Sequence, residues 1–193
     1  MAKKNITDKM ILQAAIDLVN EKGYENFSLR EVAKRLGCQA PSLYNHIKDF
    51  DELKAMLSIY VSKRILTVLQ DAVEGKNDDD AFVAAALAYR QFAVDNYQFY
   101  KIFVYSPELQ NSEVKQAGID SFEPFKKIID LYGLSKDDTI HFLRALRSFM
   151  HGFIELTVNG FMQKPDYPKD KSYIIIIKNY LSILKLKGRG VSF

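Results

Sequence analysis

Five polar side chains follow one another closely in the stretch from residue 39 to residue 46. All are short or flat, and all can donate or accept hydrogen bonds, so they could reach base edges or phosphates of a nucleic acid. Arg30 and Lys48, on either side, could add positive charge toward phosphate oxygens. The five residues are Gln39, Ser42, Tyr44, Asn45 and His46.

The rest of the chain offers no set of residues that resembles a catalytic centre. It contains three histidines and one cysteine, but no glycine-rich phosphate loop, nucleophile elbow or metal-spaced His/Cys cluster. The run Asp78–Asp80 is read as a solvated loop and helix cap. We therefore expect that the protein is not an enzyme and has no catalytic residues, cofactor or metal.

The polar stretch belongs to a predicted helix-turn-helix over residues 28–47. Ser28 is a good N-cap and forms a capping box with Glu31, while Gly37 is a typical helix end. Pro41 suits the first turn of a second helix, which must be held by packing because it is short. Two short helices joined by a glycine can also be a plain structural corner, so this pattern alone leaves both readings open.

Helical spacing continues through the whole chain and predicts an all-α fold. Thr7 is expected to cap a first helix that reaches Lys22, and Asp49, with Glu52 in a second capping box, a long helix to about Glu74. We predict a DNA-binding domain over 5–65 and a helical ligand-binding and dimerisation domain over 66–193. The further helices are expected at about 80–95, 97–105, 112–132 with an interruption between Gly118 and Pro124, 136–160 and 171–186.

Read in full, the first third of the chain resembles the DNA-binding signature of the TetR family of bacterial transcriptional regulators. The resemblance is carried by Ala14, Phe27, Val32-Ala33, Gly37, Leu43-Tyr44-x-His46 and Leu53. Together with the polar stretch, it implies a set of DNA-binding residues. That set comprises Ser28, Arg30, Gln39, Ala40, Pro41, Ser42, Leu43, Tyr44, Asn45, His46 and Lys48.

Two positions depart from the family pattern. Ile47 stands where Phe is usual, which exchanges one apolar group for another. Phe50 stands where the family usually has a Lys that contacts DNA phosphate, so this contact is in doubt, and Lys48 is a candidate substitute.

Charge and composition agree with a DNA-binding first part. Residues 1–64 contain 11 Lys or Arg and 8 Asp or Glu, whereas the remaining residues hold 16 of each. The net positive charge therefore lies where phosphate contact is expected. No apolar run is long enough to span a membrane. A single cysteine, Cys38, excludes an intramolecular disulfide and favours the cytoplasm.

The last two predicted helices carry more apolar surface than one chain needs. Ala145, Ser148 and Gly152 form a face of small residues on the helix predicted at 136–160. The helix predicted at 171–186 is apolar on two sides. We therefore predict a homodimer, the alternative being that both sides are buried within one chain. The TetR resemblance implies the same, because these regulators typically dimerise through their last two helices. The candidate interface residues are Ala145, Ser148, Gly152, Tyr173, Ile176, Tyr180 and Ile183.

Aromatic residues gather in the second part, with 15 Phe or Tyr between Phe82 and Phe161 and four in residues 1–50. They are candidate walls of a pocket for a small apolar or aromatic effector, although ordinary core is the plainer reading. Residues 149–153 also resemble a motif with Trp-His-Gly in one subgroup of TetR C-terminal domains. The candidate pocket residues are Tyr89, Phe92, Tyr97, Tyr100, Phe103, Phe122, Phe125, Arg147, Phe149, His151 and Glu155.

Taken together, the expected function is a regulator that binds a palindromic double-stranded operator. The resemblance implies a repressor released by an effector whose identity the sequence does not reveal, and it does not separate a repressor from an activator. The alternative is a ligand-independent DNA-binding dimer whose second domain only dimerises.

Overall fold

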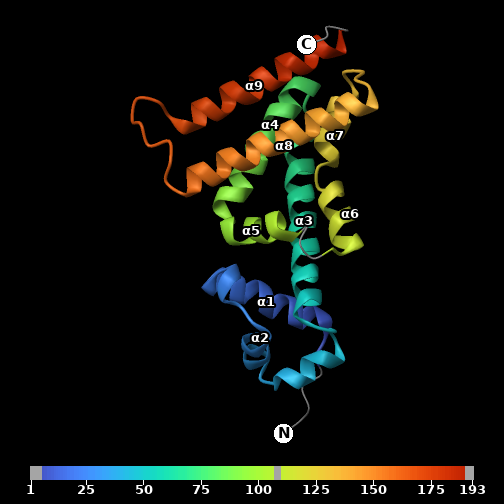
Figure 1. The fold of residues 1–193 in the computed structure, drawn as a ribbon, viewed down its shortest axis with the longest axis vertical. Coiled ribbons are helices and arrows are strands. Elements are labelled where there is room, and N and C mark those ends of the chain that lie inside the picture. Colours follow the sequence, from blue (N-terminus) through green and yellow to red (C-terminus); the bar gives the residue numbers. More distant parts are fainter. Residues whose placement is uncertain (1–5, 107–109, 190–193) are drawn as a thin grey trace. The chain divides into compact units, whose positions relative to one another are not determined.

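The computed structural model describes residues 6–106 and 110–189, and every regular element in these two ranges is a helix (Figure 1). The predicted all-α class is confirmed. Residue 5, the first of the predicted DNA-binding domain, and residues 190–193 lie outside the described residues. The α-helices are α1 Asp8–Lys22, α2 Leu29–Leu36, α3 Phe50–Val73, α4 Asp78–Asp95, α5 Tyr97–Tyr105, α6 Ser112–Asp120, α7 Glu123–Asp130, α8 Lys136–Val158 and α9 Lys169–Gly188, with two short 3-10 helices, η1 Tyr24–Asn26 and η2 Ala40–Asn45.

The chain packs into two compact units. The first consists of Met1–Arg64 and Asn96–Asp120, and the second of Ile65–Asp95 and Ser121–Phe193. Helix α3 contributes residues to both units, and α5 and α6 belong to the first unit although they follow α4 in sequence.

Local signals set most of the helix boundaries. The side chains of Thr7, Ser28 and Ser135 accept hydrogen bonds from backbone N–H groups in the first turns of α1, α2 and α8, as N-caps do. Gly37 ends α2 with a φ of 71°, a left-handed conformation that costs glycine little. The interruption predicted after Gly118 is confirmed as the break between α6 and α7.

In each predicted capping box, only the hydrogen bond from the Glu backbone N–H to the side chain of the cap residue forms as expected. The Ser28 side chain accepts a hydrogen bond from Glu31 N at 3.4 Å, but the Glu31 carboxylate pairs with Lys22 of α1. Glu52 N donates to Asp49 at 2.8 Å, while the Glu52 carboxylate accepts from the N–H of Lys48. In both cases the Glu side chain reaches a partner other than the cap residue.

The core of the first unit joins the N-terminal helices to α5. Val19 of α1, Val32 of α2 and Leu57 of α3 are fully buried, and burial of such a side chain stabilises by about 1.5–3 kcal/mol. Helix α5 contacts η1 through polar groups as well: Tyr24 N donates to Gln98 Oε1 at 3.2 Å, and Lys101 lies 2.8 Å from Glu25. Through these contacts α5 is held against the N-terminal helices.

The second unit is built around aromatic side chains of α4, α7, α8 and α9. The rings of Phe82 and Phe125 meet edge to face with centroids 5.8 Å apart, a favourable geometry for aromatic pairs. Tyr173 is fully buried, and its hydroxyl donates to Ala86 O at 2.9 Å. Helices α8 and α9 run side by side in this unit (Figure 1).

Helix α9 is longer than predicted at both ends. It begins at Lys169, where Asp170 in its first turn lies 2.6 Å from the buried Arg90 of α4. Near its other end, Lys185 pairs with Asp79, which also accepts a hydrogen bond from Tyr132 at 2.7 Å. The bonds from Lys185 and Tyr132 hold the pKa of Asp79 below its usual value. These ion pairs are long-range contacts that helical periodicity does not report.

Within the described residues, none of the helices combines the length and apolar character needed to cross a membrane.

Candidate nucleic-acid interface

Helix α2, a tight turn and η2 form the predicted helix-turn-helix. Cys38 N donates to Ala33 O at 3.0 Å after the left-handed Gly37, so the chain reverses directly behind α2. The second element is a 3-10 helix rather than an α-helix, with bonds from Ser42 N to Gln39 O and from His46 N to Leu43 O, both 2.9 Å long. Its shortness explains this, because 3-10 geometry is common in pieces of this length.

Two apolar side chains anchor η2 to the core. Leu43 is 0% exposed, and Ile47 is 2% exposed. Leu43 was among the residues expected to contact DNA, and the structure corrects that expectation because the side chain has no accessible surface. Its role is to fix the orientation of η2, which determines where the other side chains point.

The remaining predicted contact residues all keep accessible surface. Tyr44 is 55% exposed. The other exposed members of the set are Arg30, Gln39, Pro41, Asn45 and Lys48, and the half-buried members are Ser28, Ala40, Ser42 and His46.

His46 is held by a contact that the sequence did not suggest. Its Nδ1 lies 3.0 Å from Oδ1 of Asp8, the first residue of α1. This hydrogen bond joins the end of η2 to the start of α1. His46 therefore positions η2 as well as offering a polar surface group, and Asp8 is a functional neighbour separated from it by 38 positions in sequence.

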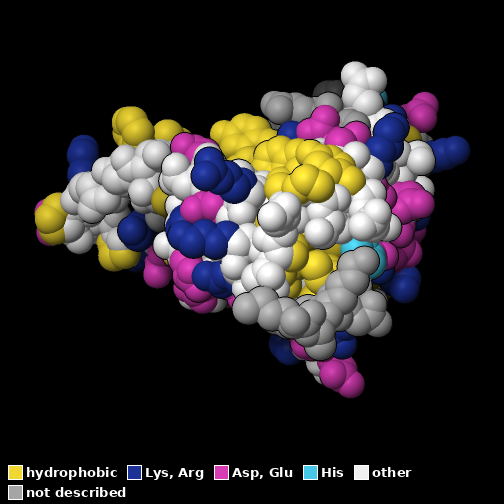
Figure 2. Space-filling view, turned by 90° about the horizontal axis from the view of Figure 1, so that it is seen from below, with side chains coloured by type: hydrophobic (Ala, Val, Ile, Leu, Met, Phe, Trp, Pro, Cys, Tyr) yellow, Lys and Arg dark blue, Asp and Glu magenta, His cyan; other side chains and the backbone are white. Residues whose placement is uncertain are grey.

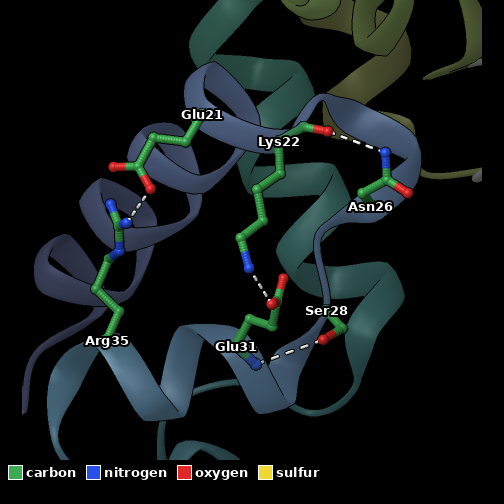
Figure 3. A network of polar contacts seen from close by, with 6 residues as sticks. All are labelled: Glu21, Lys22, Asn26, Ser28, Glu31 and Arg35. Atoms are coloured by element: carbon green, nitrogen blue, oxygen red, sulfur yellow. Dashed lines mark hydrogen bonds and ion pairs between the residues drawn. The ribbon is translucent and has the colours of Figure 1, made fainter.

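A polar network fixes one flank of α2 against α1 (Figure 3). Glu31 pairs with Lys22, and Arg35 pairs with Glu21 and lies 3.7 Å from Asp17. The hydrogen bond from Arg35 holds the pKa of Glu21 below its usual value, so the carboxylate stays ionised. Because these pairs are exposed, they add little to stability, and their main effect is on the orientation of α2.

The other flank of α2 carries basic residues that are available to a ligand. Arg30 and Lys34 are four residues apart and exposed, and neither forms an ion pair within the described part of the chain. The residues predicted to contact DNA include Arg30 but not Lys34. The helical spacing from Arg30 was the signal that could have found it. One flank of α2 thus satisfies its charges internally, while the other presents two cations.

No single basic field dominates the face of the molecule drawn in Figure 2. Lys and Arg side chains lie there among Asp and Glu side chains and hydrophobic patches. On this face, attraction to phosphate would depend on particular residues and not on a continuous basic surface.

Phe50, which stands in place of the usual phosphate-binding Lys, has a packing role. Its ring lies 4.9 Å from that of the buried Phe27, at the start of α3. One turn later, the Lys54 ammonium lies 5.2 Å from the centre of the Phe50 ring, and it pairs with Asp51. The sequence indicates Lys48 as a candidate substitute cation, and the structure adds Lys54 as a second candidate.

The predicted pocket residues are divided between the two units. Tyr97, Tyr100 and Phe103 belong to α5 in the first unit, and the other predicted pocket residues belong to the second. In the second unit, the ring of Phe122 lies 5.3 Å from Tyr89 and 5.7 Å from Phe125.

Arg147 of α8 completes this cluster, with its guanidinium 4.7 Å from the Phe122 ring centre. One turn away, burial lowers the pKa of His151, and Arg147 adds to that effect against an opposing contribution from Glu155. Ring contacts of this kind are those of a packed core, so a ligand-binding role for the cluster remains a proposal.

The predicted dimer face divides into an exposed part and a buried part. Ala145, Ser148 and Ile183 are exposed, and Gly152, Ile176 and Tyr180 are half-buried. Tyr173 does not belong with them, because it is fully buried in its own chain and its hydroxyl is bonded to Ala86 O. It is therefore withdrawn from the predicted interface.

Several known proteins are similar to this chain over nearly its full length. YobS, an uncharacterised HTH-type transcriptional regulator of Bacillus subtilis strain 168, is 28% identical over 187 residues, a match that covers 96% of each chain. Apo ActR from Streptomyces coelicolor superposes with a TM-score of 0.76 at 14% identity, covering 99% of this chain and 100% of that one. A TetR variant from Acinetobacter baumannii AYE in complex with minocycline gives a TM-score of 0.68 at 16% identity, covering 97% and 100%. At these identities the two structures show a shared fold.

Two family models match the chain, one in each part. Residues 11–53 match the model for bacterial regulatory proteins of the tetR family. Residues 82–180, which are more than half of the chain, match the model for the tetracyclin repressor-like C-terminal domain. The helix-turn-helix with its anchored η2 lies within the first match. The chain therefore belongs to the tetR family of bacterial regulatory proteins.

Proposed function

We propose that the protein is a homodimeric transcriptional repressor that binds a palindromic operator and is released from it by a small apolar or aromatic effector. In this proposal residues 5–65 bind DNA, and residues 66–193 bind the effector and dimerise. The observation that supports it most is the anchoring of η2 by Leu43 and Ile47, which leaves Tyr44 55% exposed together with its polar neighbours. A rigid element that presents polar side chains can enter a major groove.

Contacts to phosphate are proposed for Arg30 and Lys34, with Lys48 and Lys54 at the other end of the motif. Each neutralised phosphate releases counterions, so the logarithm of the binding constant falls with the logarithm of salt concentration by about 0.9 per contact. This effect does not depend on base sequence. It can therefore be measured on any duplex before the operator is known.

The first prediction concerns the double variant Arg30→Gln, Lys34→Gln. If both residues contact phosphate in both subunits, the salt slope for a random duplex falls by about 3.6 units, and affinity at low salt falls with it. Fluorescence anisotropy over a series of sodium chloride concentrations measures the slope. The control, Lys115→Gln with Lys136→Gln, removes the same charge from exposed sites on α6 and α8. A slope equal to that of the unmodified protein would remove α2 from the interface.

Dimerisation is proposed through exposed surface of α8 and α9. Leu156 and Ile183 are each 42% exposed, and the small residues Ala145 and Ser148 on α8 allow another helix to come close. Burial of such side chains between two copies is the expected source of affinity. In a single copy of the chain, this apolar surface is in contact with water.

Effector binding is proposed for the aromatic cluster around Phe122, where Arg147 can orient a guest. The structural neighbour that contains minocycline supports a ligand role for this fold. Helix α3 contributes residues to both units, so it is the candidate route from effector to DNA. The direct ring contacts of Phe122 favour the second candidate function, a DNA-binding dimer that takes no ligand.

Thermal unfolding with a panel of flat aromatic compounds distinguishes these two functions. An effector present at about a hundred times its Kd stabilises the native state by about 2.7 kcal/mol, which raises Tm by about 5 to 10 °C. Arg147→Gln is expected to reduce this rise, whereas Arg144→Gln, at an exposed site on the same helix, leaves it unchanged. A panel without any stabilising compound favours the ligand-independent dimer.

A further inference from the structure

A surface groove of about 350 Å³ lies between the last turn of α3 and the first half of α7, in the second unit. Its lining does not include Phe122 or the aromatic residues around it. Val73, Pro124 and Ile128 supply the apolar part of its lining. Pro124 and Ile128 are buried, so they form a fixed apolar base. The volume is at the lower end of the range for small-molecule sites, about 300–1,000 Å³.

The same groove is lined by three carboxylates. Asp71 and Glu74 come from α3 and Glu123 from α7, and Lys127 is the single cation beside them. Neither Asp71 nor Glu74 forms an ion pair within the described residues. The lining therefore has an excess of negative charge over an apolar base.

The position of Asp71 and Glu74 is unfavourable for the fold itself. Asp71 lies in the last turn of α3, which contains no basic residue, and Glu74 directly follows the helix end at Val73. The partial negative charge of the terminal carbonyls disfavours a carboxylate at this position. Unfavourable local charge that nothing in the fold offsets is expected at functional sites. A bound cation would offset the charge of these two carboxylates.

The arrangement does not suit a metal ion. In the described part of the chain, no group of three or more His, Cys, Asp or Glu side chains is placed to hold one. Carboxylates that are spread along an apolar surface instead fit positive charges that are separated by a carbon chain. We propose that this groove binds an aliphatic diamine or polyamine, with its ammonium groups at Asp71, Glu74 and Glu123 and its methylene groups on Pro124 and Ile128.

Isothermal titration calorimetry with octamethylenediamine tests this site on the full chain. Saturable binding is expected, and it weakens as sodium chloride is raised, because exposed charges are screened. Octamethylene glycol has the same carbon chain without charge and is expected not to bind. Magnesium chloride at matched ionic strength has charge without a carbon chain and is expected not to displace the diamine.

Charge variants locate the site and give effects of opposite sign. Glu74→Gln with Glu123→Gln is expected to raise the Kd about tenfold, as the loss of two exposed ion pairs would. Lys127→Gln removes the competing cation and is expected to lower the Kd by about threefold. The control Glu113→Gln with Asp137→Asn removes two exposed carboxylates elsewhere and leaves the Kd unchanged.

Circular dichroism confirms that each variant is folded before titration. Three results would each overturn the proposal: no saturable binding of the diamine, equal binding of the glycol, or the same Kd change in the control double variant. The groove shares no residue with the proposed DNA and effector sites, so such a result does not count against those proposals.

Discussion

Tyr44→Ala will weaken binding to the preferred operator by about 2 to 6 kcal/mol, since a base contact is worth about 1–3 kcal/mol and a dimer makes it twice. The reason lies in how η2 is built. Leu43 and Ile47 hold it from behind, so the 55% exposed Tyr44 ring is free to meet DNA. Gel-shift titration of the operator measures the loss.

The same variant should leave folding and phosphate attraction unchanged. Its Tm and its salt slope on a random duplex are expected to match those of the unmodified protein, because the ring contributes neither core packing nor charge. Tyr105→Ala is the matched control, since Tyr105 is 47% exposed on α5, outside the motif. Equal operator affinity in the two variants would show that η2 is not the reading element.

Ile183→Glu will separate the dimer and thereby abolish tight operator binding. In a symmetric dimer each substitution occurs twice, and an unpaired charge that is taken out of water costs several kcal/mol. We therefore expect the dimer Kd to rise at least about a thousandfold, since each 1.4 kcal/mol is a factor of ten. A separated subunit binds one half-site and loses the gain from joining two.

Sedimentation equilibrium measures the mass, and gel shift the operator affinity. The protomer itself should remain folded, because Ile183 is 42% exposed within one chain. Lys178→Glu, at an exposed site on a different side of α9, is the control and keeps the dimer. A dimer that survives Ile183→Glu with unchanged Kd would place the interface elsewhere.

The helix boundaries were predictable because their signals are local. A cap such as Thr7 or Ser135 bonds to an N–H three residues later, and Gly37 takes a conformation that other residues avoid. These signals placed α1, α2, α3 and α8 within one or two residues. The form of η2 was less predictable, because a short segment with Pro41 in its first turn is compatible with either an α-helix or a 3-10 helix.

What could not be predicted depends on contacts between distant residues. Nothing near His46 in sequence points to Asp8, and nothing near Arg90 points to Asp170. Helix α9 has two apolar sides, so periodicity did not tell which one is core. Burial decides it, because Ile177, Leu181 and Leu184 are buried within the chain, whereas Ile183 is 42% exposed. Likewise, the packing role of Phe50 depends on its ring contact with Phe27, which lies far from it in sequence.

Selection of binding sites from a pool of random duplexes tests the central claim most directly. The protein is incubated with the pool, bound duplexes are amplified over several rounds, and the enriched sequences are aligned. We predict a single motif with two-fold symmetry, read by one η2 from each subunit, and we predict that Tyr44→Ala fails to enrich it. Enrichment of no sequence, or of a motif without symmetry that Tyr44→Ala enriches equally well, would contradict the account.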